Sequence, residues 1–101
     1  KGKLNDYQGA IFDFNKAIEI DPKDADAYFN LGVMYAEGDG VQMNLPRAYA
    51  YLRFAEVLGA GDTHEALAEI REELSEEDIF QADFYFEELG RASEDEQDEW
   101  T

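Results

Sequence analysis

The chain has 101 residues, no cysteine, and 25 acidic against 8 basic side chains, which gives a formal net charge of −17. This balance excludes nucleic acid or an anionic membrane as the main partner, because Lys and Arg are needed to neutralise phosphates. Disulfides and thiolate metal sites are excluded as well, and no apolar run approaches the ~18 residues of a membrane-spanning helix. The chain begins with lysine, so we expect a piece of a longer or trimmed protein.

Residues 6–20 are predicted to form an amphipathic helix. Asp6 suits its N-cap, and Asp21-Pro22 ends it, because the residue before proline is pushed out of helical geometry. Apolar residues recur on one face at spacings of three and four: Tyr7, Ala10, Ile11, Phe14, Ala17 and Ile18.

Two further helices are predicted on either side of a glycine-containing loop. The first starts at Asp24 or Ala25 and stops at Gly38-Asp39-Gly40. After the loop 38–45, Asn44 caps the next helix and Pro46 occupies its first turn. Gly59-Ala60-Gly61 closes that helix.

Residues 62–92 are predicted to form a terminal pair of helices. Asp62 opens the first, and Ser75 caps the second in a pattern that resembles a capping box, with Asp78 as the third-position acid. We expect this last helix to end near Ala92 and the acidic residues 93–101 to be disordered. Residues 62–101 hold 2 basic and 16 acidic residues, so most of the negative charge lies there.

The predicted fold is all-α, with antiparallel helical hairpins stacked as a short right-handed α–α superhelix of about five helices. We expect residues 1–92 to form a single domain, followed by an acidic tail over 93–101.

Residues 6–22 resemble the second helix of a tetratricopeptide repeat, and residues 24–61 are similar to a Sel-one-like repeat, with Arg47 in place of its usual lysine. Residues 62–92 look like the capping pair at the C-terminal end of such an array. In these families, glycines permit close helix contacts and special backbone angles. The positions that carry the resemblance are Ala10, Phe14, Ala17, Pro22, Leu31, Gly32, Tyr35, Gly38, Gly40, Ala48, Tyr51, Ala55 and Gly59.

The resemblance implies a partner-binding groove. One helix of each hairpin faces the concave side of an array, and the residues expected there are Asp26, Phe29, Asn30, Val33 and Glu37. The alternative is that Phe29 and Val33 only pack against a preceding helix. The set of Lys and Arg residues that clamps a carboxylate in chaperone-binding members is absent from this sequence.

Phe80 and Phe84 form an i, i+4 pair outside the main apolar stripe of the last helix. We expect them to be buried as a second core contact; the alternative is an exposed aromatic patch for a partner or a second copy. Phe12 poses the same question in the first helix.

The sequence offers no catalytic, cofactor or metal site. His64 is the only histidine, and the carboxylates from Glu72 to Asp78 lack the spacing of a calcium loop. We therefore expect no enzyme activity and no cofactor.

The leading hypothesis is a scaffold or adaptor that binds a protein or peptide, with a basic partner favoured by the charge. Two alternatives remain open. The chain is a structural C-terminal cap of an array whose recognition lies upstream, or it forms a homo-oligomer through the face left open by a missing first helix, at Tyr7, Phe14, Phe29 and Val33.

Overall fold

The computed structural model describes the backbone of residues 7–61 and 63–98 and the side chains of 9–61 and 63–91. Five α-helices make up this part of the chain, and it contains no strand, so the predicted all-α class is confirmed. They are α1 (Tyr7–Ile20), α2 (Ala25–Glu37), α3 (Leu45–Val57), α4 (Thr63–Glu73) and α5 (Glu76–Asp98).

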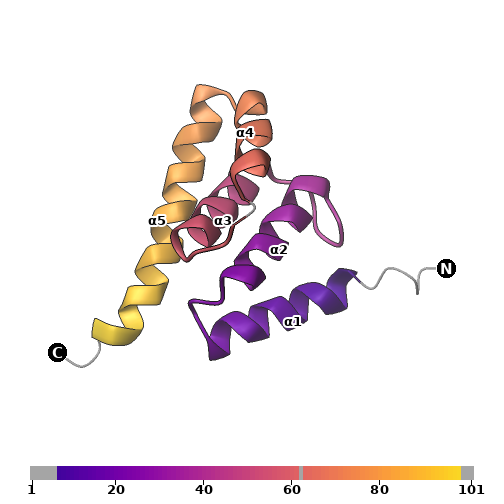
Figure 1. The fold of residues 1–101 in the computed structure, drawn as a ribbon. Helices are drawn as coiled ribbons and strands as arrows, with labels where there is room; N and C mark the ends of the chain where they lie inside the picture. Colours follow the sequence, from indigo (N-terminus) through magenta and orange to yellow (C-terminus); the bar gives the residue numbers. More distant parts are fainter. Residues whose placement is uncertain (1–6, 62, 99–101) are drawn as a thin grey trace.

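Helix α3 lies at the centre of the fold (Figure 1). It packs against α2, α4 and α5, whereas α1 packs chiefly against α2. In Figure 1, α5 and α2 lie on opposite sides of α3, with α4 above and α1 across the lower end of α2.

The helix boundaries follow from local capping. The carboxylate of Asp24 accepts a hydrogen bond from the amide of Ala27 at 3.3 Å, and the Asn44 side chain accepts one from the amide of Arg47 at 3.1 Å. At the other end of α2, Gly38 adopts the left-handed conformation (φ 75°) and donates its amide to the carbonyl of Met34 at 2.8 Å. The sequence predicted Asn44 as a cap and a helix stop beginning at Gly38, whereas for α2 it predicted only a start at Asp24 or Ala25.

The capping box at α5 is also present. The amide of Asp78 donates to the Ser75 hydroxyl at 3.1 Å, and the amide of Ser75 donates to the Asp78 carboxylate at 3.2 Å. The backbone amides of Ser75 and Asp78 thus each have a side-chain acceptor in the other residue. Asp78 takes the place that is more often taken by Glu in this motif.

Burial is concentrated around α3. One buried cluster joins α3 to α4 and α5, and a second joins α3 to α2 through Tyr28, Phe54 and Ala55. The members of the first cluster are Ala48, Tyr49, Leu52, Ile70 and Ala82. Burial of apolar area is the main favourable term in folding, so the contacts of α3 contribute most to the stability of the fold.

Gly32 allows α2 and α3 to approach closely. A Cβ atom at this position would lie 2.7 Å from Cγ of Leu52 and 3.2 Å from the carbonyl oxygen of Ala48. Both distances are shorter than ordinary van der Waals contact, so any side chain here would push the helices apart.

Helix α5 is longer than expected. It continues to Asp98, although the sequence predicted an end near Ala92 and a disordered tail from residue 93. Ala, Glu and Gln are good helix formers, and neither Gly nor Pro follows Gly90 in the sequence, so the helix has no local stop signal there. The last part of the predicted tail, residues 99–101, lies outside the described residues.

Candidate protein-interaction surfaces

A groove runs between α2, the loop that follows it, α3 and α4, with a volume of about 270 Å³. We call it the α2–α4 groove. Its walls include the Met43 side chain, which is 58% exposed. The remaining apolar lining consists of Val33, Ala36, Leu45, Leu52, Ala66 and Ile70. The floor is therefore apolar and open to a ligand.

Three glutamates, Glu37, Glu69 and Glu73, line the same groove, and all three are exposed. None of them forms an ion pair with a described basic side chain. A hydrogen bond with Asp39, followed by burial and the negative charge of Asp39, raises the pKa of Glu37. The groove is thus a site where an added positive charge would relieve repulsion between carboxylates.

The structure divides the five predicted groove residues. Val33 and Glu37 line the α2–α4 groove, opposite α4. Asp26 is exposed, and the Asn30 amide is used within its own helix, where it donates to the Asp26 carbonyl at 2.9 Å. Phe29 is half-buried and packs against both core clusters. Packing of Phe29 against a preceding helix stays a prediction.

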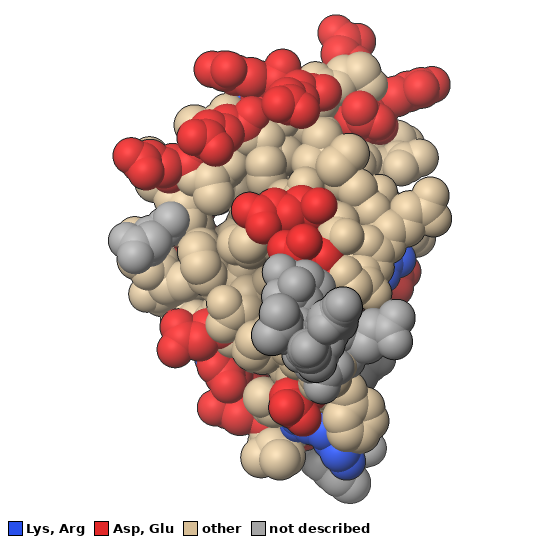
Figure 2. Space-filling model, turned by 90° about the vertical axis from the view of Figure 1, so that its right-hand side faces the viewer, with Lys and Arg blue, Asp and Glu red and all other residues tan. Residues whose placement is uncertain are grey.

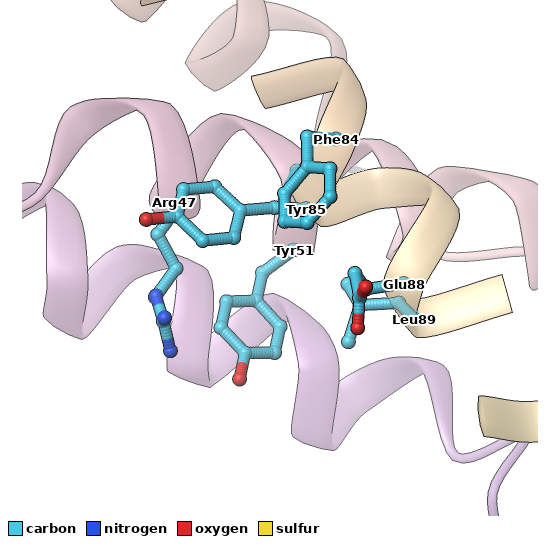
Figure 3. A pocket seen from close by; sticks show the side chains of 7 residues that line it. Arg47, Tyr51, Phe84, Tyr85, Glu88 and Leu89 are labelled. Atoms are coloured by element: carbon cyan, nitrogen blue, oxygen red, sulfur yellow. The ribbon is translucent and has the colours of Figure 1, made fainter. Parts of the chain in front are cut away.

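A second hollow of about 400 Å³ lies between α3 and α5 (Figure 3). The Arg47 guanidinium lies 4.7 Å from the ring centre of Tyr85 and 5.5 Å from that of Tyr35. Tyr35 in turn stacks on Tyr51, with ring centres 5.5 Å apart and planes within 9°. Arg47 therefore joins three helices through cation–π contacts.

Burial raises the pKa of Tyr51, and the neighbouring Tyr35 adds to the rise, while Arg47 opposes it. The hollow was not predicted from the sequence. Arg47 and Tyr51 do lie at i, i+4 on one helix face, which places them together, but which rings of α2 and α5 complete the arrangement depends on tertiary packing.

A further set of aromatic contacts connects α2, α3 and α5. Tyr28 packs edge-on against Phe54 at 4.8 Å, and Phe54 packs edge-on against Phe86 at 6.0 Å. Arg53 lies over the Phe86 ring at 4.3 Å and contacts the Asp83 carboxylate at 3.2 Å. These contacts determine which face of α5 packs against α3.

This packing exposes Phe80 and Phe84, which are 76% and 59% exposed. The expectation that they form a second core contact is wrong, and the exposed aromatic patch is the arrangement found. The reason is that α5 packs with one face only, through Ala82, Tyr85, Phe86 and Leu89. Phe12 is likewise exposed, at 63%.

The single histidine of the sequence lies on the surface. The His64 side chain is 89% exposed, with its Nδ1 atom 3.6 Å from a carboxylate oxygen of Glu56. Among the described side chains, those of residues 9–61 and 63–91, no cluster is suited to hold a metal ion. Over the same residues, no helix combines the length and apolar character needed to cross a membrane.

The face shown in Figure 2 carries acidic side chains along its upper edge, the end of the molecule where α4 and the start of α5 meet. Basic atoms are sparse on this face and are visible only at its right edge and near its lower end (Figure 2). The visible surface thus follows the strongly acidic composition of residues 62–101.

Packed helices joined by short loops give an all-α fold that is consistent with helical repeats of the TPR kind. Residues 3–38 match the family model of the TPR repeat, which confirms the tetratricopeptide resemblance of residues 6–22. The match continues over α2, which the sequence assigned to a Sel-one-like repeat. A TPR repeat supports a general role as a protein–protein interaction module, and such modules are typically not enzymes. The Sel-one-like character of residues 24–61 stays a prediction. No curated protein and no solved structure matches the chain.

Proposed function

We propose that this chain is an adaptor module that binds a short basic peptide in the α2–α4 groove. The observation that carries the proposal is the apolar floor of this groove beside three glutamates without a described basic partner. An apolar side chain of the peptide would bury itself against Val33 and Ile70. Flanking Lys or Arg residues would pair with the carboxylates.

The dimensions of the groove favour a peptide side chain. Its volume of about 270 Å³ lies just below the range of roughly 300–1,000 Å³ that is usual for small-molecule pockets. The burial of one apolar side chain supplies affinity, and the surrounding negative field raises the association rate of a basic ligand.

The proposal is tested with a short Lys-rich peptide that has one central Leu and a proline that prevents helix formation. Titration by fluorescence anisotropy should show binding to the parent chain, and a Glu-rich peptide of the same pattern should not bind. The double variant Glu69→Gln/Glu73→Gln should weaken binding by up to about fivefold, because the exposed pairs contribute up to about 1 kcal/mol in total.

A matched control removes the same charge elsewhere on α4. Glu65→Gln/Glu72→Gln changes two exposed residues that do not line the groove, so it should alter the affinity by less than about twofold. An equal loss in both variants would show attraction to general negative charge only, and would overturn the proposal.

The two other hypotheses stay predictions. The face around Phe14, Phe29 and Val33 is half-buried, while the Tyr7 side chain lies outside the described residues. Light scattering over a range of concentrations, run on the same samples, tests the homo-oligomer.

A further inference from the structure

The exposed face of α5 carries a second apolar surface, separate from the α2–α4 groove. We call it the α5 aromatic surface. Phe80 and Phe84 lie one turn apart and border a shallow hollow of about 620 Å³ along α5. Phe84 also lines the 400 Å³ hollow between α3 and α5, so it forms a ridge between the two.

The length of this surface suits a helix. From Phe80 to Leu89 it extends about 14 Å along α5 at 1.5 Å per residue. A ridge one side chain wide with a hollow on either side is the shape into which the side chains of a crossing helix can pack. Phe80 and Phe84 are two of the exposed large hydrophobic residues of the described chain, and they stand next to each other on one helix.

The charges around this surface select the partner. Glu76, Glu77 and Asp78 form the first turn of α5, and Asp83 and Glu87 line the hollow beside the phenylalanines. Of these, Asp83 has a described basic partner, Arg53. The rim is therefore acidic on balance, and it complements a ligand that carries Lys or Arg beside its apolar face.

The same charges oppose a second copy of this chain. A symmetric pair through α5 would place identical acidic surfaces against each other. Repulsion between the facing carboxylates would then counteract the burial of the phenylalanine rings.

We propose that the α5 aromatic surface binds a basic amphipathic helix of a partner protein, whose apolar face covers Phe80 and Phe84. The site is separate from the α2–α4 groove, because every residue that lines the hollow beside the phenylalanines belongs to α5 and no α5 residue lines the groove. The chain would thus bind two partners, or two segments of one partner, at once.

The test uses a Leu/Lys amphipathic helical peptide labelled for fluorescence anisotropy, with a Leu/Glu peptide of the same pattern as the ligand control. The Leu/Lys peptide should bind, and the double variant Phe80→Ala/Phe84→Ala should raise its Kd about tenfold or more. Since both side chains are exposed, the helix content of the variant by circular dichroism should match that of the parent chain.

Phe12→Ala is the matched control, because it removes an equally exposed phenylalanine from α1. It should leave the Kd within about twofold, whereas an equal loss in both variants would indicate general hydrophobic adsorption and overturn the proposal. Amide chemical-shift changes should concentrate on α5; changes confined to α2 and α4 would assign the peptide to the groove instead.

Two further outcomes overturn the proposal: no binding of the Leu/Lys peptide, or concentration-dependent dimers in light scattering that Phe80→Ala/Phe84→Ala abolishes. The second outcome would assign the surface to a second copy of the chain. The groove proposal fails separately, in the titration of the proline-containing peptide.

Discussion

Gly32 lies where α2 meets the Leu52 side chain and the Ala48 carbonyl of α3. Gly32→Ala gains up to about 1 kcal/mol of helix propensity, but the added methyl group overpacks a fully buried contact, which costs about 1–3 kcal/mol. We expect a net loss of up to about 2 kcal/mol in the free energy of unfolding, measured by urea denaturation.

Gly90→Ala is expected to change the free energy of unfolding in the opposite direction from Gly32→Ala. Gly90 lies within α5, and a Cβ atom there would be 4.0 Å from Phe54, which is ordinary contact. This variant should stabilise the chain by about 0.5–1 kcal/mol. A stabilised Gly32→Ala variant would contradict the close approach of α2 and α3.

Tyr28 gives a prediction at alkaline pH. Burial, with smaller contributions from Tyr51, Asp21 and Asp24, raises the pKa of Tyr28 to about 12 from 10. The folded state therefore keeps this phenol neutral, and its contribution to stability is complete below pH 10 and falls as the pH rises from about 10 to 12.

Tyr28→Phe should remove this loss. Between pH 9 and pH 11.5 the parent chain should lose about 1–2 kcal/mol more unfolding free energy than the variant does. Urea denaturation of both proteins at the two pH values measures the difference. Parallel losses in the two proteins would mean that Tyr28 ionises as readily in the folded chain as in the unfolded one.

At the scale of the helix, the reciprocal cap of α5 predicts the effect of a single hydroxyl group. Ser75→Ala removes the acceptor for the Asp78 amide and should lower the unfolding free energy by about 1 kcal/mol. Ser75→Thr keeps a hydroxyl at the same place and should lose much less. Thermal denaturation followed by circular dichroism compares them, and equal losses would count against the cap.

The elements that the sequence predicted correctly are those with local signals. Asn44, Gly38 and the Ser75–Asp78 pair each act within four residues, so their positions can be read from composition and spacing. At the end of α5 the acidic composition favours disorder, whereas the helix propensity of the residues favours continuation of the helix. The prediction relied on the composition, but the helix continues to Asp98.

Features that depend on how helices pack were harder to predict. The aromatic residues of α5 occupy more than one face, and the contacts of α5 with α3, such as that of Phe86 with Phe54, decide that Phe80 and Phe84 are exposed. Likewise, Val33 was expected in a groove, but nothing local shows that Ile70 and Glu73 of α4 lie opposite it. The candidate site was therefore predicted in part, by residue type and helix face.

At the scale of the whole molecule, the net charge of −17 means that added salt should raise the thermal stability and lower the affinity for basic peptides. Raising NaCl from about 10 to 300 mM shortens the Debye length from roughly 30 Å to below 10 Å, which screens repulsion within the compact folded chain. We expect Tm to rise by several degrees. Over the same range, the affinity for basic peptides should fall, because the attraction is screened as well.

Differential scanning fluorimetry and peptide titration at matched ionic strengths measure the two effects. An uncharged solute such as sucrose controls for general stabilisation by excluded cosolvents, and it should raise Tm without weakening the peptide complexes. A Tm that is independent of salt would show that the charges are spaced too widely to repel each other appreciably.

The unequal packing of α1 and α3 implies that the chain does not open all at once. Because α1 packs chiefly against α2, it can detach while the cluster around Leu52 stays closed, whereas α3 cannot leave without breaking its contacts with three helices. Amide hydrogens of α1 should therefore exchange with solvent deuterium through a local opening, and those of α3 only through global unfolding. The segment that matches the TPR repeat would then be, in part, the least protected region of the molecule.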